Sequence, residues 1–435
     1  MTDHSSDRKI SAEWVLLPDG WHQHVEIRFD ESGLISELLP SNGINSHHVL
    51  IPGMINVHSH AFQRGLVGKT QRFSRPEDDF WSWRTHMYSA VGKLSPDKQR
   101  TDSKNLFDEF IRNGYTTVCE FHYTHGAVER GNAEIPALTC EALLEAASDS
   151  GIRMLLLPVL YQQGGFGQRP ASSDQRSFLL NTDVYLALID HLRSESGISN
   201  LQRIGYAPHS LRAVTEDALR DLLDHRRDNA PDSPIHIHIS EQIREINECV
   251  LATRKRPVEW LLDSCDVDQN WCLIHATHIT SAELEGIVKS GATVGLCPTT
   301  EADLGDGVFP MVEFLDSAGN WAIGSDSNVC VNPCEEIRLI DYHQRLINRR
   351  RNVFHIDTAL GSGTRLYLDA CEGGRRACGM PVGRIESGSH ADMIALRSDT
   401  DMTQGLSADE MLNAYIYAGG RDLIEEVFVA GNPRF

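Results

Sequence analysis

The stretch Val49-Leu-Ile-Pro-Gly-Met-Ile-Asn-Val-His-Ser-His-Ala61 decides the fold of this chain. Its apolar part predicts a buried strand, and His58 and His60 follow at the C-terminal end of that strand. Because residues two apart in a strand point to the same face, both imidazoles can reach one ion. The pair therefore indicates a metal site at the end of a strand.

Three further residues with metal-binding side chains end apolar runs elsewhere in the chain. His238 ends Ile235-His-Ile-His238, His275 ends Trp271-Cys-Leu-Ile-His275, and Asp326 ends Trp321-Ala-Ile-Gly-Ser-Asp326. Neutral imidazole and carboxylate groups are the ligands that a borderline divalent metal such as zinc binds. Strand ends that converge on one point are typical of the top face of a barrel, where such folds carry their chemistry.

Eight apolar runs, each of which ends near a polar residue, predict the strands of that barrel. They lie at about residues 49–58, 116–122, 153–161, 203–209, 234–240, 271–277, 293–299 and 321–326. Segments between them have the helical spacing of apolar residues, as in Asn105–Arg112 and Ala282–Lys289. This alternation of strand and helix predicts a (β/α)8 barrel, a TIM-like α/β fold, over residues 49–382.

Both ends of the chain have a different pattern. Residues 1–48 alternate polar and apolar positions like short β-strands, with turns at Asp19-Gly20 and Ser32-Gly33, and residues 383–435 show the same pattern. We therefore expect the two ends to fold together as one small, split β-sandwich domain beside the barrel. No internal repeat or low-complexity tract interrupts this organisation.

Composition limits the classes of partner. The 435 residues carry a formal net charge of −21, which argues against binding to nucleic acid or anionic membranes. The first residues are polar and no apolar run approaches the roughly 20 residues of a membrane span, so we expect neither a signal peptide nor a membrane anchor. Ten scattered cysteines without a CxxC pair are typical of a cytoplasmic protein with reduced thiols.

The order of these motifs resembles the amidohydrolase superfamily along essentially the whole chain. The resemblance implies that His58, His60, His238 and Asp326 bind a metal ion. Binuclear members have a bridging carboxylated lysine or a carboxylate at the end of the fourth strand, whereas this strand ends Gly205-Tyr-Ala-Pro-His209. We therefore expect one divalent ion per chain, with zinc favoured and iron or manganese left open.

Two pairs of histidines compete for roles in the site. His236 and His238 share a face of the fifth strand, but His238 lies nearer the C-terminal end. We therefore expect His238 to bind the ion and His236 to fill the barrel interior. In the same way, His275 ends the sixth strand, and His278 is expected to begin the loop that follows.

The deaminase-like branch of the superfamily, with its His-x-x-Glu pattern on the fifth strand, implies roles for three residues. Asp326 would accept a proton from the attacking water, and His275 would stabilise the negative charge that develops on oxygen. Glu241 would deliver a proton to the nitrogen that leaves as ammonia. The alternative for Glu241 is a solvent-exposed acid in the first turn of a helix. The pattern predicts hydrolytic deamination of an amidine-like or aromatic C=N carbon.

Five loops closely resemble the formimidoylglutamate deiminase family. They are Ser59–Arg64, Phe80–Arg84, Glu120–His125, Ala207–Arg212 and Thr300–Gly307. The resemblance implies that N-formimino-L-glutamate and water give N-formyl-L-glutamate and ammonia, a step of histidine degradation. This small dianionic substrate has two carboxylates, which Arg84 and Arg212 can bind bidentately. Neutral donors would come from Gln63, Tyr123 and His209, and we expect a homodimer.

Two positions in these loops depart from the family pattern. A histidine is expected where Gly126 stands, and a serine where Thr299 stands. Neither position is among the expected metal ligands. The departures therefore bear on the choice of substrate and not on the reaction.

Two alternatives remain open at this stage. Phe80, Trp81 and Trp83 could close over a ring, as in a mononuclear deaminase or dechlorinase that acts on a purine, pyrimidine or triazine. A neutral ring, however, needs no pair of arginines. The other alternative is a metal-binding scaffold without catalysis. Glu241 and His275 argue against it, because neither residue is needed to hold the ion.

Overall fold

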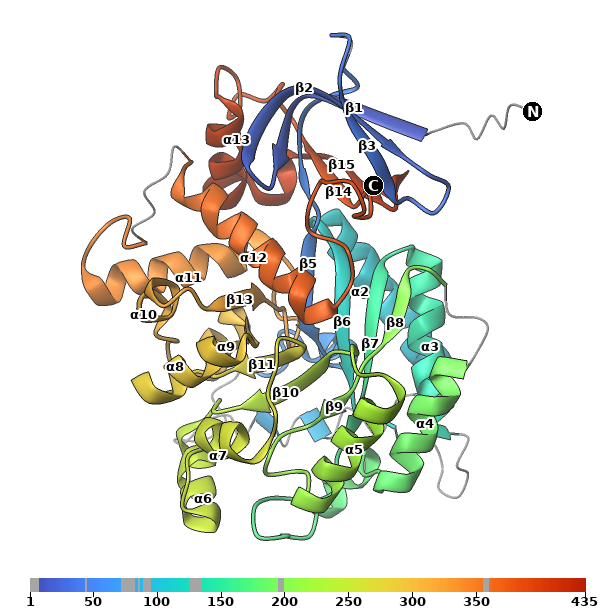
Figure 1. Cartoon of the computed structure of the whole chain (residues 1–435), viewed down its shortest axis with the longest axis vertical. Coiled ribbons are helices and arrows are strands. Elements are labelled where there is room, and N and C mark those ends of the chain that lie inside the picture. The colour runs from blue at the N-terminus through green and yellow to red at the C-terminus, as the bar shows by residue number, and fades with distance from the viewer. Residues whose placement is uncertain are drawn as a thin grey trace.

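The computed structural model describes residues 8–43, 45–71, 83–84, 87–88, 95–125, 135–194, 199–354 and 360–435. It shows a barrel of parallel strands surrounded by helices and, next to it, a sheet formed from both chain ends (Figure 1). Three residues discussed above, Phe80, Trp81 and Gly126, lie outside the described residues. Among the residues described, no helix has the length and apolar character needed to cross a membrane.

The barrel is built from parallel strands that occupy eight positions around a ring. They are β5 (Met54–Ser59), β6 (Tyr115–His122), β7 (Arg153–Leu160), β8 (Gln202–Ile204), β9 (Ala207–Pro208), β10 (Ile235–Ile239), β11 (Trp271–His275), β12 (Thr293–Leu296) and β13 (Asn320–Ile323). The short strands β8 and β9 share the fourth position and both pair with β7. The predicted (β/α)8 barrel is therefore confirmed.

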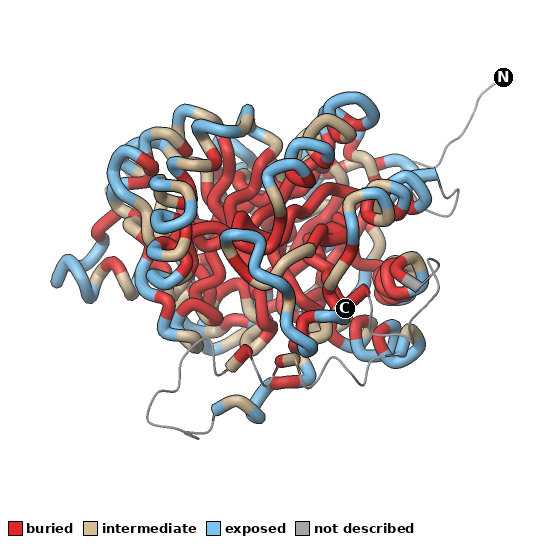
Figure 2. Tube along the Cα trace, turned by 90° about the horizontal axis from the view of Figure 1, so that it is seen from below, coloured by how far each residue is buried: buried red, intermediate tan, exposed pale blue. Residues whose placement is uncertain are grey.

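Isolated backbone bridges close the ring where the regular ladders stop. Ser210 pairs with His238, which joins the fourth position to β10. Ser59 pairs with Asp326, which joins β5 to the segment after β13. The strands themselves form the buried centre of the molecule, and the exposed segments lie around it (Figure 2).

Helices cover the outside of the barrel (Figure 1). They are α2 (Pro96–Arg112), α3 (Ile135–Ser150), α4 (Thr182–Ser194), α5 (Glu216–Asn229), α6 (Ile243–Thr253), α7 (Pro257–Ser264), α8 (Ser281–Ser290), α9 (Pro298–Leu304), α10 (Met311–Asp316), α11 (Pro333–Asn348) and α12 (Ser362–Cys378), with the short turns η1 (Ala61–Leu66) and η2 (Ser173–Phe178). Helix α2 begins after Ser95, whose side chain accepts from the Lys98 N–H. Helix α12 packs directly on β13, since a Cβ on Gly373 would lie 1.8 Å from the carbonyl oxygen of Trp321.

Strands from both chain ends form one seven-stranded sheet in the order β16-β15-β14-β4-β1-β2-β3. They are β1 (Arg8–Leu17), β2 (Gly20–Phe29), β3 (Ile35–Pro40), β4 (His47–Pro52), β14 (Met393–Leu396), β15 (Ile424–Val429) and β16 (Asn432–Pro433), and α13 (Ala408–Ala414), η3 (Tyr415–Gly419) and η4 (Gly420–Leu423) lie between β14 and β15. Leu16 and Val49 face the large core shared with the barrel, whereas Val15 and Leu50 face a separate apolar core. The predicted small β-domain from both termini is confirmed.

The strand predicted at residues 49–58 is two strands, and this detail of the prediction is wrong. Residues His47–Pro52 form β4, which pairs with β1 and β14 in the terminal sheet. The barrel begins only with β5, which pairs with β6. Gly53 separates β4 from β5 and packs closely against β6, since a Cβ at this position would lie within 2.8 Å of the Thr116 side chain. Residues 49–52 therefore pair with the terminal sheet. The continuous apolar sequence does not show the change of sheet.

Candidate active site

A pocket opens at the C-terminal ends of the barrel strands. Its empty volume is about 490 Å³. The side chains that line it are His60, Gln63, Trp83, Arg84, Met87, Tyr88, Tyr123, Tyr161, Phe178, His209, Arg212, His238, Glu241, His275, Leu304 and Asp326. Every predicted catalytic and substrate-binding residue is in this set. The predicted ligand His58 lies behind it and is fully buried.

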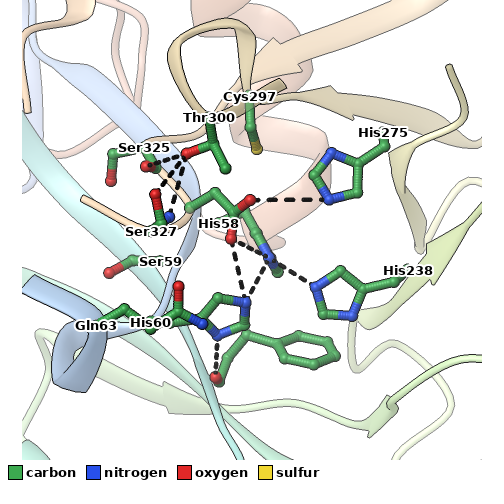
Figure 3. Close-up of polar contacts among 12 residues, drawn as sticks. His58, Ser59, His60, Gln63, His238, His275, Cys297, Thr300, Ser325 and Ser327 are labelled. Carbon is green, nitrogen blue, oxygen red and sulfur yellow. Dashed lines mark hydrogen bonds and ion pairs between the residues drawn. The ribbon is translucent and has the colours of Figure 1, made fainter. Parts of the chain in front are cut away.

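Three histidine side chains meet at the base of the pocket (Figure 3). Nε2 of His58 lies 3.1 Å from Nε2 of His60 and 3.0 Å from Nε2 of His238. Nδ1 of His60 donates to the carbonyl oxygen of Phe121 at 2.8 Å, and Nδ1 of His238 donates to that of His209 at 3.0 Å. The protons of these two rings therefore lie on Nδ1, and their Nε2 lone pairs are directed towards His58.

These converging lone pairs need a positive partner. A single proton on Nε2 of His58 could not be donated to both neighbouring histidines. Burial and the neighbouring histidines lower the pKa of His58 and of His238 well below the usual value, so both rings are neutral. Neutral imidazoles with convergent Nε2 atoms suit a divalent transition metal, and the residues therefore fit such an ion.

Asp326 joins this group from the segment that follows β13. Its Oδ1 lies 3.2 Å from Nε2 of His60 and 3.5 Å from Nε2 of His58. Its Oδ2 faces Nε2 of His275 at 3.8 Å. One carboxylate thus borders both the histidine cluster and the residue expected to stabilise charge on oxygen.

A buried hydrogen-bond network joins β5 to the segment that carries Asp326. Asn56 accepts from the backbone N–H of Ser325 at 3.0 Å and donates to the Ser325 hydroxyl at 2.6 Å. That hydroxyl donates to Asn328, whose amide donates to the carbonyl oxygen of His60 at 3.0 Å. The network holds the strand ends that carry His60 and Asp326 in fixed relation to each other.

The backbone is strained at two of these strand ends. His275 has a φ of 70° and Asp326 a φ of 47°, in the left-handed region that side chains disfavour. Such conformations cost about 1–3 kcal/mol each and persist where the surrounding structure holds them. At Asp326 the backbone bridge to Ser59 does so. The strain therefore lies where the site requires a particular side-chain direction.

Three carboxylates surround His275. Its Nδ1 lies 3.2 Å from Glu301, and its Nε2 lies 3.9 Å from Glu241 and 3.8 Å from Asp326. Burial lowers the pKa of this ring, but the carboxylates of Glu241, Glu301 and Asp326 together raise it to about 10. The three carboxylates therefore favour the protonated form of His275, whose Nε2 lies on the side of Glu241 and Asp326.

Glu241 is a buried acid at the end of β10, with 4% of its surface exposed, and not a solvent-exposed helix acid. Glu245, in the first turn of α6, accepts the Glu241 backbone N–H at 3.0 Å through Oε2. The same oxygen faces Nη1 of Arg212 at 3.8 Å. One buried carboxylate thus holds the backbone of Glu241 and balances the charge of Arg212.

Two buried arginines line the pocket. Burial opposes the charge of Arg212, but the carboxylates of Glu245 and Glu241 raise its pKa above the usual value. Its Nε and Nη1 have no hydrogen-bond partner among the residues that the structure describes. Nη2 of Arg84 donates to the Tyr161 hydroxyl at 2.7 Å. A buried guanidinium with unused donors indicates an anionic ligand.

The predicted neutral donors lie next to the histidine cluster. Gln63 donates to the Tyr123 hydroxyl at 2.9 Å, and the Tyr123 ring lies 5.0 Å from the His60 ring. The His209 ring lies 4.9 Å from the ring of His238. Burial and the nearby arginines lower the pKa of His209 well below the usual value, so this ring is neutral. The Tyr123 hydroxyl and the His209 ring can therefore donate or accept hydrogen bonds next to the histidine cluster.

Some residues that the sequence singled out do not line the pocket. Nε2 of His236 lies 2.9 Å from the carbonyl oxygen of Ala377, within the barrel. Nε2 of His278 lies 2.7 Å from the carbonyl oxygen of Asp306, in the loop after β11. Thr299 hydrogen-bonds to α11 instead of facing the pocket. Its departure from the family pattern therefore changes no lining side chain.

Several functional residues were missed from the sequence. Tyr161 lines the pocket and is the last residue of the predicted strand 153–161, a position that could have identified it. Glu245 lies in the first turn of α6, a position from which an acidic side chain can accept a backbone N–H just before the helix, as it does from Glu241. Glu301 lies inside one of the five loops that carry the resemblance, but only the structure shows its contact with His275.

Comparison with known proteins agrees with this geometry. Residues 49–433 match the model of the Amidohydrolase family. Formimidoylglutamate deiminase from Pseudomonas aeruginosa is 40% identical over 426 residues, which cover 97% of this chain and 93% of that relative.

Solved structures give the same result. An amidohydrolase from Brucella melitensis has a TM-score of 0.89 and 36% sequence identity, over 98% of this chain and 94% of that chain. An adenosine deaminase from Xanthomonas campestris with bound zinc has a TM-score of 0.78 over 98% of this chain and 92% of that chain; at 22% identity it shows the fold alone. The family match and the extent of the similarity together establish that the chain belongs to the amidohydrolase family.

Proposed function

We propose that this protein is a metal-dependent hydrolytic deiminase that converts N-formimino-L-glutamate and water to N-formyl-L-glutamate and ammonia. One observation carries the proposal: a single pocket combines a histidine cluster suited to a metal ion with two buried arginines suited to carboxylates. The 40% identical relative is itself a formimidoylglutamate deiminase, which supports the same substrate.

The proposed metal ligands are His58, His60, His238 and Asp326. Three imidazoles and a carboxylate suit zinc, which we propose over iron and manganese. When bound, such an ion lowers the pKa of a water molecule towards 7 and supplies a nucleophile at neutral pH. Elemental analysis of the purified protein would identify the ion, and the expected content is one per chain.

The residues around the reacting carbon divide the proton transfers. Asp326 accepts a proton from the attacking water, while the positively charged His275 stabilises the oxygen on which negative charge develops. Glu241 transfers a proton to the nitrogen that leaves. Over the whole reaction both water protons end on that nitrogen, which departs as ammonia. Glu241 and Asp326 therefore return to their starting states.

The arginines account for the charge of the proposed substrate. The unused Nε donor of Arg212 suits one oxygen of a substrate carboxylate, and the charge of the guanidinium favours such a group. Arg84 supplies the second guanidinium, and Gln63, Tyr123 and His209 surround the part of the substrate nearest the histidines. Positive charge at the substrate end of the pocket offsets the overall charge of −21.

A heteroaromatic substrate is the second candidate function. Tyr88, Tyr123 and Phe178 line the pocket and could pack against a ring, which favours this alternative. The two buried arginines argue against it, because a neutral ring offers no carboxylate to the unused donors of Arg212. The alternative is therefore a triazine, purine or pyrimidine hydrolase that the same assay can test.

We further propose that the reaction belongs to histidine degradation in the cytoplasm and that the protein is a homodimer. The free thiols of all ten cysteines support a reducing compartment. The acidic net charge suits a protein that acts on a small molecule and does not bind nucleic acid or membranes. Light scattering of the purified protein would test the expected homodimer.

An ammonia-release assay tests the proposed function. The zinc-loaded protein is given N-formimino-L-glutamate and, separately, guanine, adenosine, cytosine and a chlorotriazine. We expect rapid release of ammonia from N-formimino-L-glutamate alone. Turnover of a heteroaromatic compound in its place would favour the second candidate function and refute the first.

A further inference from the structure

The hydroxyl group of Tyr161 has an unusual hydrogen-bond arrangement. Its oxygen lies 2.7 Å from Nη2 of Arg84 and 2.6 Å from Nε2 of Gln175. A guanidinium can only donate. The amide of Gln175 also donates here, because its oxygen is occupied at 2.9 Å by the backbone N–H of Ser172, which fixes the orientation of the amide. The Tyr161 oxygen therefore accepts two hydrogen bonds.

The proton of the Tyr161 hydroxyl has no hydrogen-bond acceptor among the described residues. With both acceptor positions filled, the Tyr161 O–H must itself donate, yet the described residues provide no acceptor for it. Tyr161 is 1% exposed and lines the pocket. A buried donor without an acceptor is costly, and one at a pocket wall indicates a ligand that accepts.

Tyr161 lies one side chain farther from the histidine cluster than His209. The centre of the His209 ring is 4.9 Å from that of the His238 ring. The centre of the Tyr161 ring is in turn 4.6 Å from that of the His209 ring. The Arg84 guanidinium is attached to Tyr161 and so belongs to the same outer region. This region combines a cation with an unused neutral donor, which suits a carboxylate.

We propose that Tyr161 donates its hydroxyl proton to the side-chain carboxylate of the substrate, beside Arg84, and that Gln175 positions the hydroxyl for this contact. The inference rests on the proposed function. The formimino carbon must lie at the histidine cluster. The α-carboxylate lies close to this carbon, because it is attached to the carbon atom that carries the formimino nitrogen. The side-chain carboxylate ends the chain and reaches the outer region where Tyr161 and Arg84 lie.

The experiment compares Tyr161→Phe with the unmodified protein on three substrates. N-formimino-L-glutamate has both carboxylates, N-formimino-4-aminobutyrate keeps only the side-chain carboxylate, and N-formimino-L-2-aminobutyrate keeps only the α-carboxylate. We expect kcat/KM to fall roughly 10- to 100-fold for the first two, mostly through KM, because one hydrogen bond to a charged group is lost. For the third substrate we expect kcat/KM to change less than about threefold, because this substrate lacks the carboxylate that would accept the hydrogen bond.

Tyr185→Phe is the matched control, since its buried hydroxyl accepts from the backbone N–H of Ala207 and lies outside the pocket. It should leave all three substrates unaffected. Equal losses of Tyr161→Phe on the three substrates, a loss confined to N-formimino-L-2-aminobutyrate, or no loss would each overturn the inference. Failure of the unmodified protein to release ammonia from N-formimino-L-glutamate would instead refute the proposed function.

Discussion

The two ends of the pocket are built in different ways. At the metal end, His60 and His238 are oriented by backbone carbonyl oxygens, at strand ends that the barrel fixes. At the outer end, Arg84 and Arg212 are oriented by other side chains, Tyr161 and Glu245. The proposed metal site therefore depends on the rigid framework, whereas the proposed substrate recognition depends on paired side chains that can change without rebuilding the barrel.

Removal of a proposed metal ligand should give the largest effect. His238→Gln is expected to lose bound metal and, with it, activity, by more than the roughly 10–100-fold that mutation of a hydrogen-bond partner of a ligand costs in metal affinity. His236→Gln is the matched control, because it lies on the same strand and its Nε2 contacts Ala377 instead. Metal content is measured by elemental analysis, and equal losses in both variants would contradict the assignment of His238.

Loss of the proposed proton donor should come next. Glu241→Gln keeps the size of the side chain but cannot transfer a proton, so kcat should fall roughly 10²–10⁴-fold. The metal content should remain unchanged, which separates this residue from the ligands. Steady-state kinetics with N-formimino-L-glutamate measures the effect. Near-normal turnover would exclude Glu241 as the proton donor.

At the outer end, the arginines should affect recognition. Arg212→Met is expected to lower kcat/KM for N-formimino-L-glutamate. The loss should correspond to about 2–5 kcal/mol of transition-state stabilisation, because a substrate carboxylate is left buried and unpaired. Arg84→Met should act in the same direction. A substrate analogue that lacks the matching carboxylate should lose much less. Equal losses for both compounds would show that the arginine supports the fold and does not bind the substrate.

The smallest effect should come from the residue that joins the two ends. Glu245→Gln keeps an acceptor for the Glu241 N–H but removes the charge facing Arg212. We expect KM to rise roughly five- to tenfold, since a charged interaction of about 1 kcal/mol is weakened. Glu283→Gln is the matched control. This buried glutamate also lies in the first turn of a helix and pairs with an arginine, Arg256, but neither residue lines the pocket. It should lower the unfolding temperature and leave KM unchanged.

The two ends also differ in how far the sequence predicted them. The metal end could be predicted because His58, His60, His238, His275 and Asp326 each close an apolar run, and parallel strands bring their ends together. The spacing within a strand is enough to separate His238 from His236. The eight strand positions were predicted for the same reason, since period and length are local properties of the sequence.

The outer end could be predicted only through a resemblance of loops, which named Arg84 and Arg212 but not their partners. Tyr161, Glu245 and Glu301 act through contacts between segments distant in sequence or between successive turns, which no local pattern reports. The division of residues 49–58 between two sheets was hidden for a similar reason. Which sheet an apolar strand joins depends on its partners and not on its own composition.

The network from Asn56 to Asn328 has a consequence for how the protein folds. Asn328 reaches the carbonyl oxygen of His60 across 268 positions of the chain, so the site is assembled by one of the most non-local contacts in the barrel. An ion that binds only the closed ring stabilises it by mass action. Uptake of metal during refolding should therefore follow the docking of the last strand on the first. The moment of metal binding measures the closure of the barrel, and a chain that ends before residue 326 lacks a complete site.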